Sequence, residues 1–419
     1  STGLGTLARF SSPQGICVDR FRNLYVADAG NNVIRKILPS GQVTTFAGTG
    51  VAGSQLGQAT NAQFSGPTGV CVDNSGNIYV ADSGNCNRIC KIDTNGMVTI
   101  FANVTQCGPG IGNYAPGLWQ LEADPAGNIY VGYWARLVEI TLDGTITGLA
   151  GTGCNCPGGW GLNVGVGIDV LTNIYAATSS LVWKIAPDGS QELFAGSGGG
   201  GFSDGPRLLS LFQGPQDAAV SSTGNIFVSD ITRVRRIRPD GWVSTLAGSG
   251  ISGYVNGPAS LARFSNAAGL CVDGESNVYV ADTGNNSIRK IWIDADGDGI
   301  PDSLEGAATP YVVGVDDRAV DSDHDGMSNS AEFEAGTDPF DPDSFLAINS
   351  LRIETDGHAA IRWRSTAGKY YVVKYSDDLA VWNVVGVPVL GDGSIISVLD
   401  PTPVRTIQQR TYRVFLADF

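Results

Sequence analysis

A six-fold internal repeat constrains this chain more than any other feature. Asn, an aliphatic residue and an aromatic residue occur in succession from positions 23, 77, 128, 173, 225 and 277, with spacings of 54, 51, 45, 52 and 52. Each copy lies among four short apolar runs that are separated by turn-forming Gly, Asn, Asp and Pro. A four-stranded unit of about 40–50 residues is typical of a propeller blade, which cannot bury both of its faces alone. The repeat therefore predicts six blades packed around an axis.

The composition favours an all-β fold and excludes several other classes of protein. The 419 residues include 57 Gly, about double the usual share of about 7%, and only 16% are charged, against about 25% in ordinary domains. No apolar run approaches the roughly 18 residues of a membrane helix, so we expect no membrane span. The one basic run, with Arg at 233, 235, 236 and 238, lies inside a single expected strand. We therefore expect no nucleic-acid partner.

Three of the six units are close copies of one another. They share Gly-x-Cys-Val-Asp at 15–19, 69–73 and 269–273, and each continues to a Val-Ala-Asp run. These runs end at Asp28, Asp82 and Asp282. The units resemble NHL repeats over about residues 10–293, more strongly in the first, second and sixth units than in the third and fourth. The resemblance implies a six-bladed β-propeller, which we assign to residues 1–293.

The repeated polar, aromatic and thiol positions have structural explanations. An Asp at a strand end followed by Gly-Asn is typical of a tight turn, so these residues are not assigned as ligands. An aromatic residue recurs at one position in every unit, which favours packing between blades over a stacking platform. These residues are Tyr25, Tyr79, Tyr130, Tyr175, Phe227 and Tyr279. Buried thiols behave as small hydrophobic groups, which explains the slot shared by Cys17, Cys71 and Cys271. The other units place Glu122, Gly167 and Ala219 in that slot.

The propeller sequence offers little for catalysis. The only His residues, His324 and His358, lie outside residues 1–293, which excludes a His-ligated lyase centre there. A calcium lactonase would need acids that converge at the channel mouth, and Glu122 and Asp169 are the only singular acids expected on inner strands. No nucleophile elbow or phosphate-binding loop occurs. We assign no catalytic or cofactor-binding residue and favour a non-catalytic protein, with a calcium-dependent lactonase or lyase as the alternative.

Residues 294–343 hold nearly all of the excess negative charge, with 15 acidic residues and one basic residue. Within them, 294–305 and 321–332 match the twelve-residue Ca²⁺ loop at every ligand position. The expected ligands are Asp294, Asp296, Asp298, Ile300, Asp302 and Glu305 in the first loop, and Asp321, Asp323, Asp325, Met327, Asn329 and Glu332 in the second. Ile300 and Met327 would use their carbonyl oxygens. Hard oxygen ligands favour Ca²⁺ as the cofactor.

The loops resemble the thrombospondin type 3 and EF-hand-like calcium loops of secreted bacterial proteins. In such proteins a short helix and a Gly-Thr-Asp-Pro stop follow the loop, and here 328–334 and 336–339 fit these parts. His324 occupies position 4, which is not a ligand position, so we expect it to be exposed. The loops are predicted to stabilise the joint between the propeller and the tail.

Residues 344–419 alternate between apolar and polar side chains. Six or seven expected strands favour a small β-sandwich, and the module resembles the fibronectin-type-III-like tail that follows such calcium loops. Trp363 and Trp382 could stack on a sugar, although core packing is the simpler interpretation.

The sixth repeat unit stops after three strands, where the acidic stretch begins. The N-terminal residues do not supply the fourth strand, because 6–10 match the connector at 260–264. We expect residues 309–315 to complete the blade, because Tyr-Val-Val-Gly at 311–314 resembles Thr-Leu-Ala-Gly at 245–248. Alternatively, a strand from another molecule fills the gap and the protein assembles into a filament.

The cysteines and the calcium loops favour an oxidising compartment. Five further Cys residues lie close together, at 86, 90, 107, 154 and 156, and pairing among the first three is one hypothesis. Because the chain begins at Ser1, we infer that a signal peptide was removed. We expect a secreted or cell-surface calcium-binding protein with a protein or glycan partner at the propeller face, or one that associates with itself.

Overall fold

The computed structural model describes residues 3–4, 8–84, 87–104, 117–133, 135–151, 164–257, 259–293, 319–322, 324, 327–329, 331–332, 346, 348–365, 370–377, 383–403 and 410–416. The chain divides into two compact units, Ser1–Trp292 and Ile293–Phe419. Both units are built from antiparallel strands, so the fold is all-β as the composition indicates.

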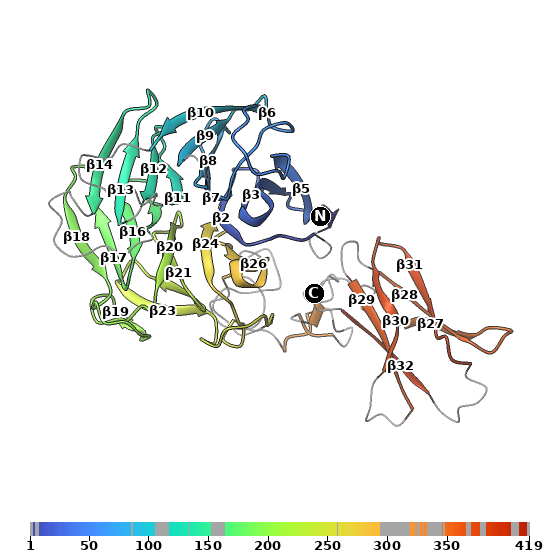
Figure 1. The fold of residues 1–419 in the computed structure, drawn as a ribbon. Coiled ribbons are helices and arrows are strands. Elements are labelled where there is room, and N and C mark those ends of the chain that lie inside the picture. Colours follow the sequence, from blue (N-terminus) through green and yellow to red (C-terminus); the bar gives the residue numbers. More distant parts are fainter. Residues whose placement is uncertain are drawn as a thin grey trace. The chain divides into compact units, whose positions relative to one another are not determined.

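The first unit is a six-bladed propeller, in which each blade is one antiparallel sheet (Figure 1). Blade 1 holds β1 (Gly3–Leu4), β2 (Pro13–Val18), β3 (Leu24–Asp28), β4 (Val33–Ile37) and β5 (Gln42–Ala47). Blade 2 holds β6 (Gly57–Gln58), β7 (Pro67–Val72), β8 (Ile78–Asp82), β9 (Arg88–Ile92) and β10 (Met97–Asn103). Blade 3 holds β11 (Leu118–Ala123), β12 (Ile129–Tyr133), β13 (Arg136–Ile140) and β14 (Ile146–Gly151).

The remaining three blades follow the same order. Blade 4 holds β15 (Gly165–Ile168), β16 (Ile174–Thr178), β17 (Leu181–Ile185) and β18 (Gln191–Ala195). Blade 5 holds β19 (Gly205–Pro206), β20 (Pro215–Val220), β21 (Ile226–Asp230), β22 (Arg233–Ile237) and β23 (Trp242–Ala247). Blade 6 holds β24 (Ala267–Val272), β25 (Val278–Asp282) and β26 (Ser287–Ile291). One-turn 3-10 helices, η1 (Ala29–Asn31) and η2 (Thr283–Asn285), follow the second strands of blades 1 and 6.

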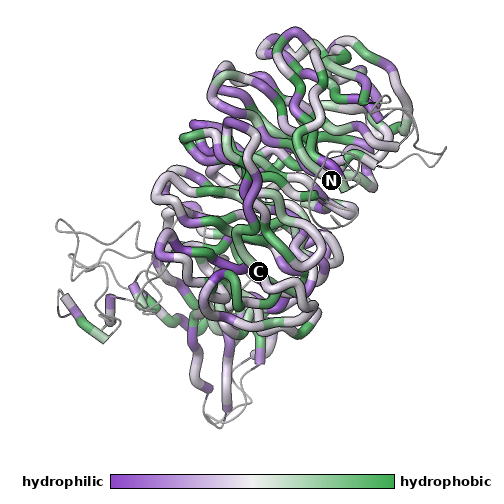
Figure 2. The backbone as a smooth tube through the Cα atoms, turned by 90° about the vertical axis from the view of Figure 1, so that its left-hand side faces the viewer, coloured by the Kyte–Doolittle hydropathy of each residue, from purple (hydrophilic) through white to green (hydrophobic). Residues whose placement is uncertain are grey.

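The core of the propeller lies between neighbouring blades. In blades 1 to 5 every residue of the second strand is buried, which explains why these strands read as short continuous apolar runs. Tyr25 and Ile34 of blade 1 pack in one cluster with Val70 and Ile78 of blade 2. Figure 2 shows hydrophobic and hydrophilic residues following one another closely along the backbone. The repeated aromatics therefore pack between blades, as the sequence predicts.

The inner strands close the ring. β2 lies beside β7 on one side and beside β24 of the last blade on the other (Figure 1). The neighbours approach so closely that a Cβ on Gly15 would lie 2.7 Å from Cα of Gly69, which leaves room only for glycine. Across the closure, the Thr283 hydroxyl donates to the carbonyl of Pro13 at 2.6 Å. First and last blades are thus joined directly.

Blade 6 has three strands among the described residues. Its Ile288 is half-buried, whereas the residues at the same register in the other blades are fully buried: Ile34, Ile89, Leu137, Val182 and Val234. β1 pairs with β5 of blade 1 and therefore does not supply the fourth strand of blade 6, as the sequence predicts. The segment 309–315 lies outside the described residues, and its role in the last blade stays a prediction.

The second unit contains two three-stranded sheets. One has the order β27 (Ile348–Ile353), β28 (Ala359–Arg364), β31 (Ile395–Leu399), and the other has the order β30 (Asn383–Leu390), β29 (Tyr370–Ser376), β32 (Thr411–Leu416). Their facing residues form one core around Trp363, which is 0% exposed and packs 5.7 Å from the ring of Tyr371. Trp363 is therefore unavailable to a sugar, and Trp382 lies outside the described residues.

Candidate functional site

A buried ion pair joins the second and third strands in four blades. Asp28, Asp82, Asp230 and Asp282 are each 0% exposed, and each pairs with an Arg of the next strand at 2.9–3.3 Å. The Arg partners are Arg35, Arg88, Arg235 and Arg289. A role in a tight turn therefore explains only in part why an Asp recurs at this strand end. The sequence carried the missing signal, because the Arg follows within seven residues in each of these blades.

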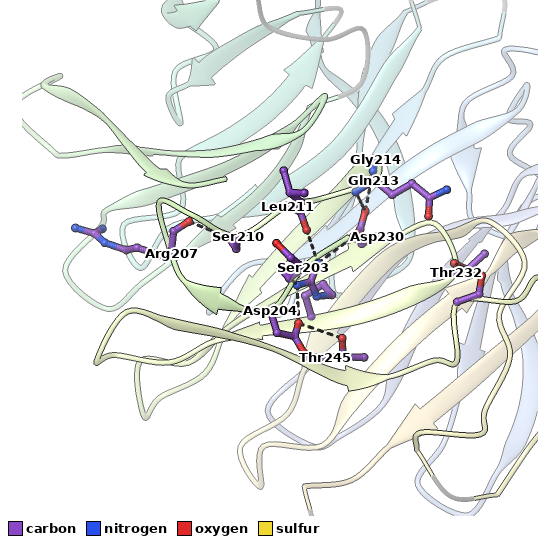
Figure 3. A network of polar contacts seen from close by, with 12 residues as sticks. Ser203, Asp204, Arg207, Ser210, Leu211, Gln213, Gly214, Asp230, Thr232 and Thr245 are labelled. Atoms are coloured by element: carbon purple, nitrogen blue, oxygen red, sulfur yellow. Dashed lines mark hydrogen bonds and ion pairs between the residues drawn. The ribbon is translucent and has the colours of Figure 1, made fainter. Parts of the chain in front are cut away.

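Blade 5 shows the network around this pair (Figure 3). Asp230 accepts hydrogen bonds from the backbone N–H groups of Gln213 and Gly214 at 2.8 and 2.7 Å. Arg235 donates to the carbonyl of Leu211 and to Asp204, which also accepts from Thr245. Burial raises the pKa of Asp230, and the N–H groups and Arg235 oppose this shift. The pair thus anchors the connector between blades, and the basic run of blade 5 is explained structurally.

A second repeated device locks the turn between the first and second strands of a blade. In blade 2, Asp73 accepts from the side chain of Asn77 at 2.7 Å and from the hydroxyl of Tyr79 at 3.2 Å. The same contacts recur at Asp19, Asp124, Asp169 and Asp273. In blade 5, Ser221 replaces the Asp and Phe227 replaces the Tyr, so both partners are absent together. Asp169 is therefore a repeated turn residue and not a singular inner-strand acid.

The axis of the propeller brings together Glu122 and three thiols. Cys17, Cys71 and Cys271 are buried and not disulfide-bonded, and Glu122 occupies the same register in blade 3. Burial raises the pKa of each thiol well above its ordinary value, and the nearby Glu122 adds to the shift. Protein surrounds the half-buried Glu122, and this desolvation raises the pKa of its carboxyl group to about 7. The thiols behave as the small hydrophobic groups that the sequence indicates.

Asp217 is an inner-strand acid that sequence reasoning missed. It occupies the register that holds Gly15, Gly69, Gly165 and Gly269 in other blades. Its carboxylate accepts from the N–H groups of Val166, Ala218 and Leu270 at 2.9–3.2 Å, which links three adjacent inner strands. Burial raises its pKa, against the effect of these N–H donors. An alignment of the six repeats would have shown that Asp217 stands at a position where four other repeats have Gly.

Blade 3 departs from the repeat at its inner strand. Gln120 stands where four blades have Gly. Its side chain reaches towards Gly269 of blade 6, so that a Cβ added to Gly269 would lie 2.9 Å from Nε2 of Gln120. This buried Nε2 group has no hydrogen-bond partner among the described residues. With Glu122 two residues further on, blade 3 thus places two large polar side chains where its neighbours place Gly and Cys.

The third strand of blade 3 carries a further departure. The residue opposite the repeated aromatic is basic in five blades: Lys36, Lys91, Lys184, Arg236 and Lys290. In blade 3 it is Glu139, opposite Tyr130. The Tyr130 hydroxyl lies 3.2 Å from Asp124 and 3.1 Å from Glu139, but its one hydrogen can be donated to only one of them at a time. Blade 3 therefore concentrates negative charge at its turn.

A cavity of about 150 Å³ opens at this turn. It lies between the first turns of blades 2, 3 and 4. Its lining residues are Val72, Asn74, Ala123, Asp124, Pro125, Ile168, Asp169 and Val170. Of the departures in blade 3, Glu139 lies next to this cavity, because Tyr130 connects it to the lining residue Asp124. The cavity is the candidate binding site.

The described part of the second calcium loop contains four of its six expected ligands. Asn329 and Glu332 are both 0% exposed, and Asn329 Oδ1 accepts from the N–H of Ser322 at 3.3 Å. Asn329, Ala331 and Glu332 are helical, as expected after such a loop, and His324 is exposed as predicted. The Asp321 carboxylate accepts a hydrogen bond from the N–H of His324 at 2.7 Å. The sulfur of Met327 accepts one from the N–H of Leu346 at 3.3 Å. Carboxylate, amide and carbonyl oxygens of this kind are the ligands that Ca²⁺ prefers. Among the described residues, no three His, Cys, Asp or Glu side chains form a metal-binding group, and the calcium assignment of this loop stays a prediction.

The other expected ligands lie outside the described residues. They are Asp323 and Asp325 of the second loop, and all of the first loop, namely Asp294, Asp296, Asp298, Ile300, Asp302 and Glu305. Of the five clustered cysteines, only Cys90 is described, and it is buried. The disulfide hypothesis therefore stays a prediction. In the part of the chain that the structure describes, no helix is long and apolar enough to cross a membrane.

Comparisons with known proteins support the repeat assignment. Residues 64–87 match the NHL repeat. NHL repeat-containing protein 2 of Bos taurus is 41% identical over 87 residues, which are 20% of this chain and 12% of that protein. SUPPRESSOR OF QUENCHING 1, chloroplastic, of Arabidopsis thaliana is 35% identical over 94 residues, which are 22% of this chain and 9% of that protein. The chain thus spans a small part of these curated relatives.

Solved structures with the same architecture are more distant in sequence. A structural genomics protein of unknown function from Bacteroides thetaiotaomicron has a TM-score of 0.56 at 20% identity, over 69% of this chain and 71% of that one. An auxiliary nutrient binding protein from the same organism has a TM-score of 0.55 at 16% identity, over 70% and 71%. An auxiliary nutrient binding protein from Bacteroides ovatus has a TM-score of 0.53 at 17% identity, over 70% and 75%. At these identities the likeness shows the fold alone.

Proposed function

We propose that this chain is a secreted, non-catalytic interaction protein that binds Ca²⁺. The propeller supplies the contact surface, and the Asp-rich loops at 294–305 and 321–332 bind the ions. The observation that carries the proposal is the complete burial of Asn329 and Glu332, at positions 9 and 12 of the second loop. Burying a carboxylate in a strongly acidic segment is costly unless a cation or hydrogen bonds compensate it.

The chemistry of the propeller axis supports a role without catalysis. The three axial thiols have raised pKa values, so they are protonated at neutral pH and are weak nucleophiles. The Asp217 carboxylate accepts hydrogen bonds from three backbone N–H groups and thereby links three inner strands of the ring. Solved structures with this architecture include two named as nutrient binding proteins, which accords with a binding role for such a propeller.

The acidic loops favour an extracellular location. Extracellular calcium modules bind with dissociation constants of about 10⁻⁴–10⁻³ M, which suit loops without the full flanking helices of an EF-hand. Such loops would be filled permanently outside the cell and would act as structural elements, not as sensors.

Calorimetric titration with Ca²⁺ tests the proposal. We expect two bound ions in the wild type and a loss of one in the double variant Asp321→Asn/Glu332→Gln. We expect chelation to lower the melting temperature of the wild type. Glu354→Gln, which removes an exposed carboxylate of the same unit, is the matched control and should bind both ions. Identical melting with and without chelator would contradict the stabilising role.

The same titration distinguishes the proposed non-catalytic protein from the alternative, a calcium-dependent lactonase or lyase. If a variant with both loops neutralised still binds one Ca²⁺ tightly, a metal site elsewhere on the propeller exists and the non-catalytic assignment fails.

A further inference from the structure

The cavity between blades 2, 3 and 4 has an apolar floor. Val72, Ala123 and Ile168 occupy one equivalent position in their blades, directly before the turn Asp. At about 150 Å³ the cavity is large enough for a molecule of the size of benzene. A short alkyl chain therefore fits on this floor.

The blade 3 residues that line the cavity are Ala123, Asp124 and Pro125, and the basic residue that other blades place opposite the repeated aromatic is missing behind them. In blades 1, 2 and 6 a Lys ammonium lies over the repeated Tyr ring at 5.3–5.8 Å, close to the turn Asp. Glu139 takes that position in blade 3 and shares the Tyr130 hydroxyl with Asp124. Among the described residues, no Lys or Arg forms an ion pair with Asp124 or Glu139.

Asp124 also accepts fewer hydrogen bonds than its counterparts. Asp73 and Asp169 each accept from the N–H two residues further on, that of Ser75 or Leu171, in addition to the Asn and Tyr contacts. Among the hydrogen bonds of the described residues, Asp124 has no such contact and keeps only its bonds from Asn128 and Tyr130. A carboxylate can accept about four hydrogen bonds, so Asp124 retains acceptor capacity on the cavity wall.

The rim of the cavity exposes aliphatic side chains. Val170 is 78% exposed and Leu171 is 72% exposed, both at the tip of the blade 4 turn. Leu142 of blade 3 is 60% exposed and lies against the blade 3 turn at Gly127. Exposed aliphatic groups around a polar pocket are typical of a protein–protein contact site.

We propose that this cavity receives a lysine side chain of a protein partner. The alkyl stem would pack on the floor and the rim, and the ammonium group would lie against Asp124 and Asp169, which line the cavity. Glu139, behind Tyr130, would favour the ammonium group at longer range, where other blades carry a basic residue. The inference rests on the proposed role as an interaction protein and names the chemistry of its contact site. Charge complementarity favours a basic partner segment over an acidic one.

An NMR titration with two capped amino acids tests the proposal. The probe is N-acetyl-lysine N-methylamide, and its isosteric neutral control is N-acetyl-norleucine N-methylamide. We expect the lysine probe to bind at least tenfold more tightly, with shifts confined to blades 2 to 4. Equal binding of both probes would show an apolar pocket only and would overturn the proposal.

Two variants locate the site. Glu139→Lys installs the residue that blades 1 and 2 carry, so it should fold, and we expect at least a tenfold loss of lysine binding. Val72→Phe fills the floor and should reduce binding of both probes. Glu275→Lys changes the charge equally at the blade 6 turn and should leave binding unchanged. If Glu139→Lys binds the lysine probe like the wild type, the proposal is wrong, whereas calcium binding by the loops would be unaffected.

Discussion

Blades 2 and 3 are neighbours with the same four-strand plan, yet different residues occupy their axial and ion-pair positions. Blade 2 has Gly69 and Cys71 at the axis and the buried pair of Asp82 and Arg88 between its second and third strands. Blade 3 has Gln120 and Glu122 at the axis, and its counterpart of Asp82 is Tyr133. The remaining blades mostly follow blade 2. Residues common to the blades therefore maintain the fold, and the exceptions in blade 3 include Glu139, next to the proposed contact site.

The largest effect that would sharpen this comparison comes from Arg88. Replacing it by Ala leaves Asp82 buried without its charge partner, because Asp82 is 0% exposed. We expect the free energy of unfolding to fall by about 3–5 kcal/mol, measured by urea denaturation. Arg238→Ala removes an exposed pair with Asp240 and should cost about 0–1 kcal/mol. A loss of less than 1 kcal/mol in Arg88→Ala would show that blade 2 depends on the pair no more than blade 3, which lacks it.

A pH-dependent effect of intermediate size is expected at Glu122. Its pKa is about 7 in the folded protein and about 4.5 when unfolded, so the folded state holds the proton more tightly. Between pH 4.5 and 7 the folded state therefore binds more protons, and stability falls as the pH rises. Glu122→Gln removes this dependence. It should leave stability nearly unchanged at pH 4 and raise it at pH 8 by at most about 3 kcal/mol.

Thermal unfolding of both proteins across this pH range measures the difference. The charge of Glu122 also helps to raise the pKa of Asp217, so the difference reports the titration of Glu122 together with its effect on Asp217. A constant gap between the two proteins from pH 4 to pH 8 would contradict the raised pKa.

The smallest expected effect concerns the repeated Tyr hydroxyl. Tyr79→Phe removes one hydrogen bond to Asp73 and should cost about 1 kcal/mol. Phe227 already occupies this position in blade 5, so the ring itself is accommodated. Tyr130→Phe should cost about the same, because the single hydroxyl hydrogen is donated to Asp124 or to Glu139 but not to both. Parallel urea denaturation of the two variants compares these losses. A clearly smaller loss in Tyr130→Phe would show that the two carboxylates do not depend on the shared hydroxyl.

Much of the fold could be predicted because repeats reveal themselves within one chain. The spacing of the Asn-x-aromatic runs indicated six units, and the strand register places the repeated aromatics and cysteines at equivalent positions. The turn Asp and its Asn partner lie four residues apart, so their contact is local. The calcium loops are also local patterns, which is why the sequence indicates them although most of their ligands lie outside the described residues.

The candidate site could not be predicted in the same way. Gln120, Glu139 and Asp217 stand out only when the blades are superimposed, because each is an exception at a register that the other blades share. Sequence reasoning selected Glu122 correctly as singular but treated Asp169 as its equal, since a strand end and a turn look alike in one dimension. The buried Arg partners were missed because strand pairing decides which charges meet.

The sequence by itself determined the repeat, its number, the all-β class and the acidic loops, since these depend on residues close together in the chain. Only the tertiary structure decided which side chains meet at the axis and which turns border the cavity. The physical reason is that closing the ring brings residues about 50 or more positions apart within contact, and their burial and charge there depend on neighbours that no local pattern names.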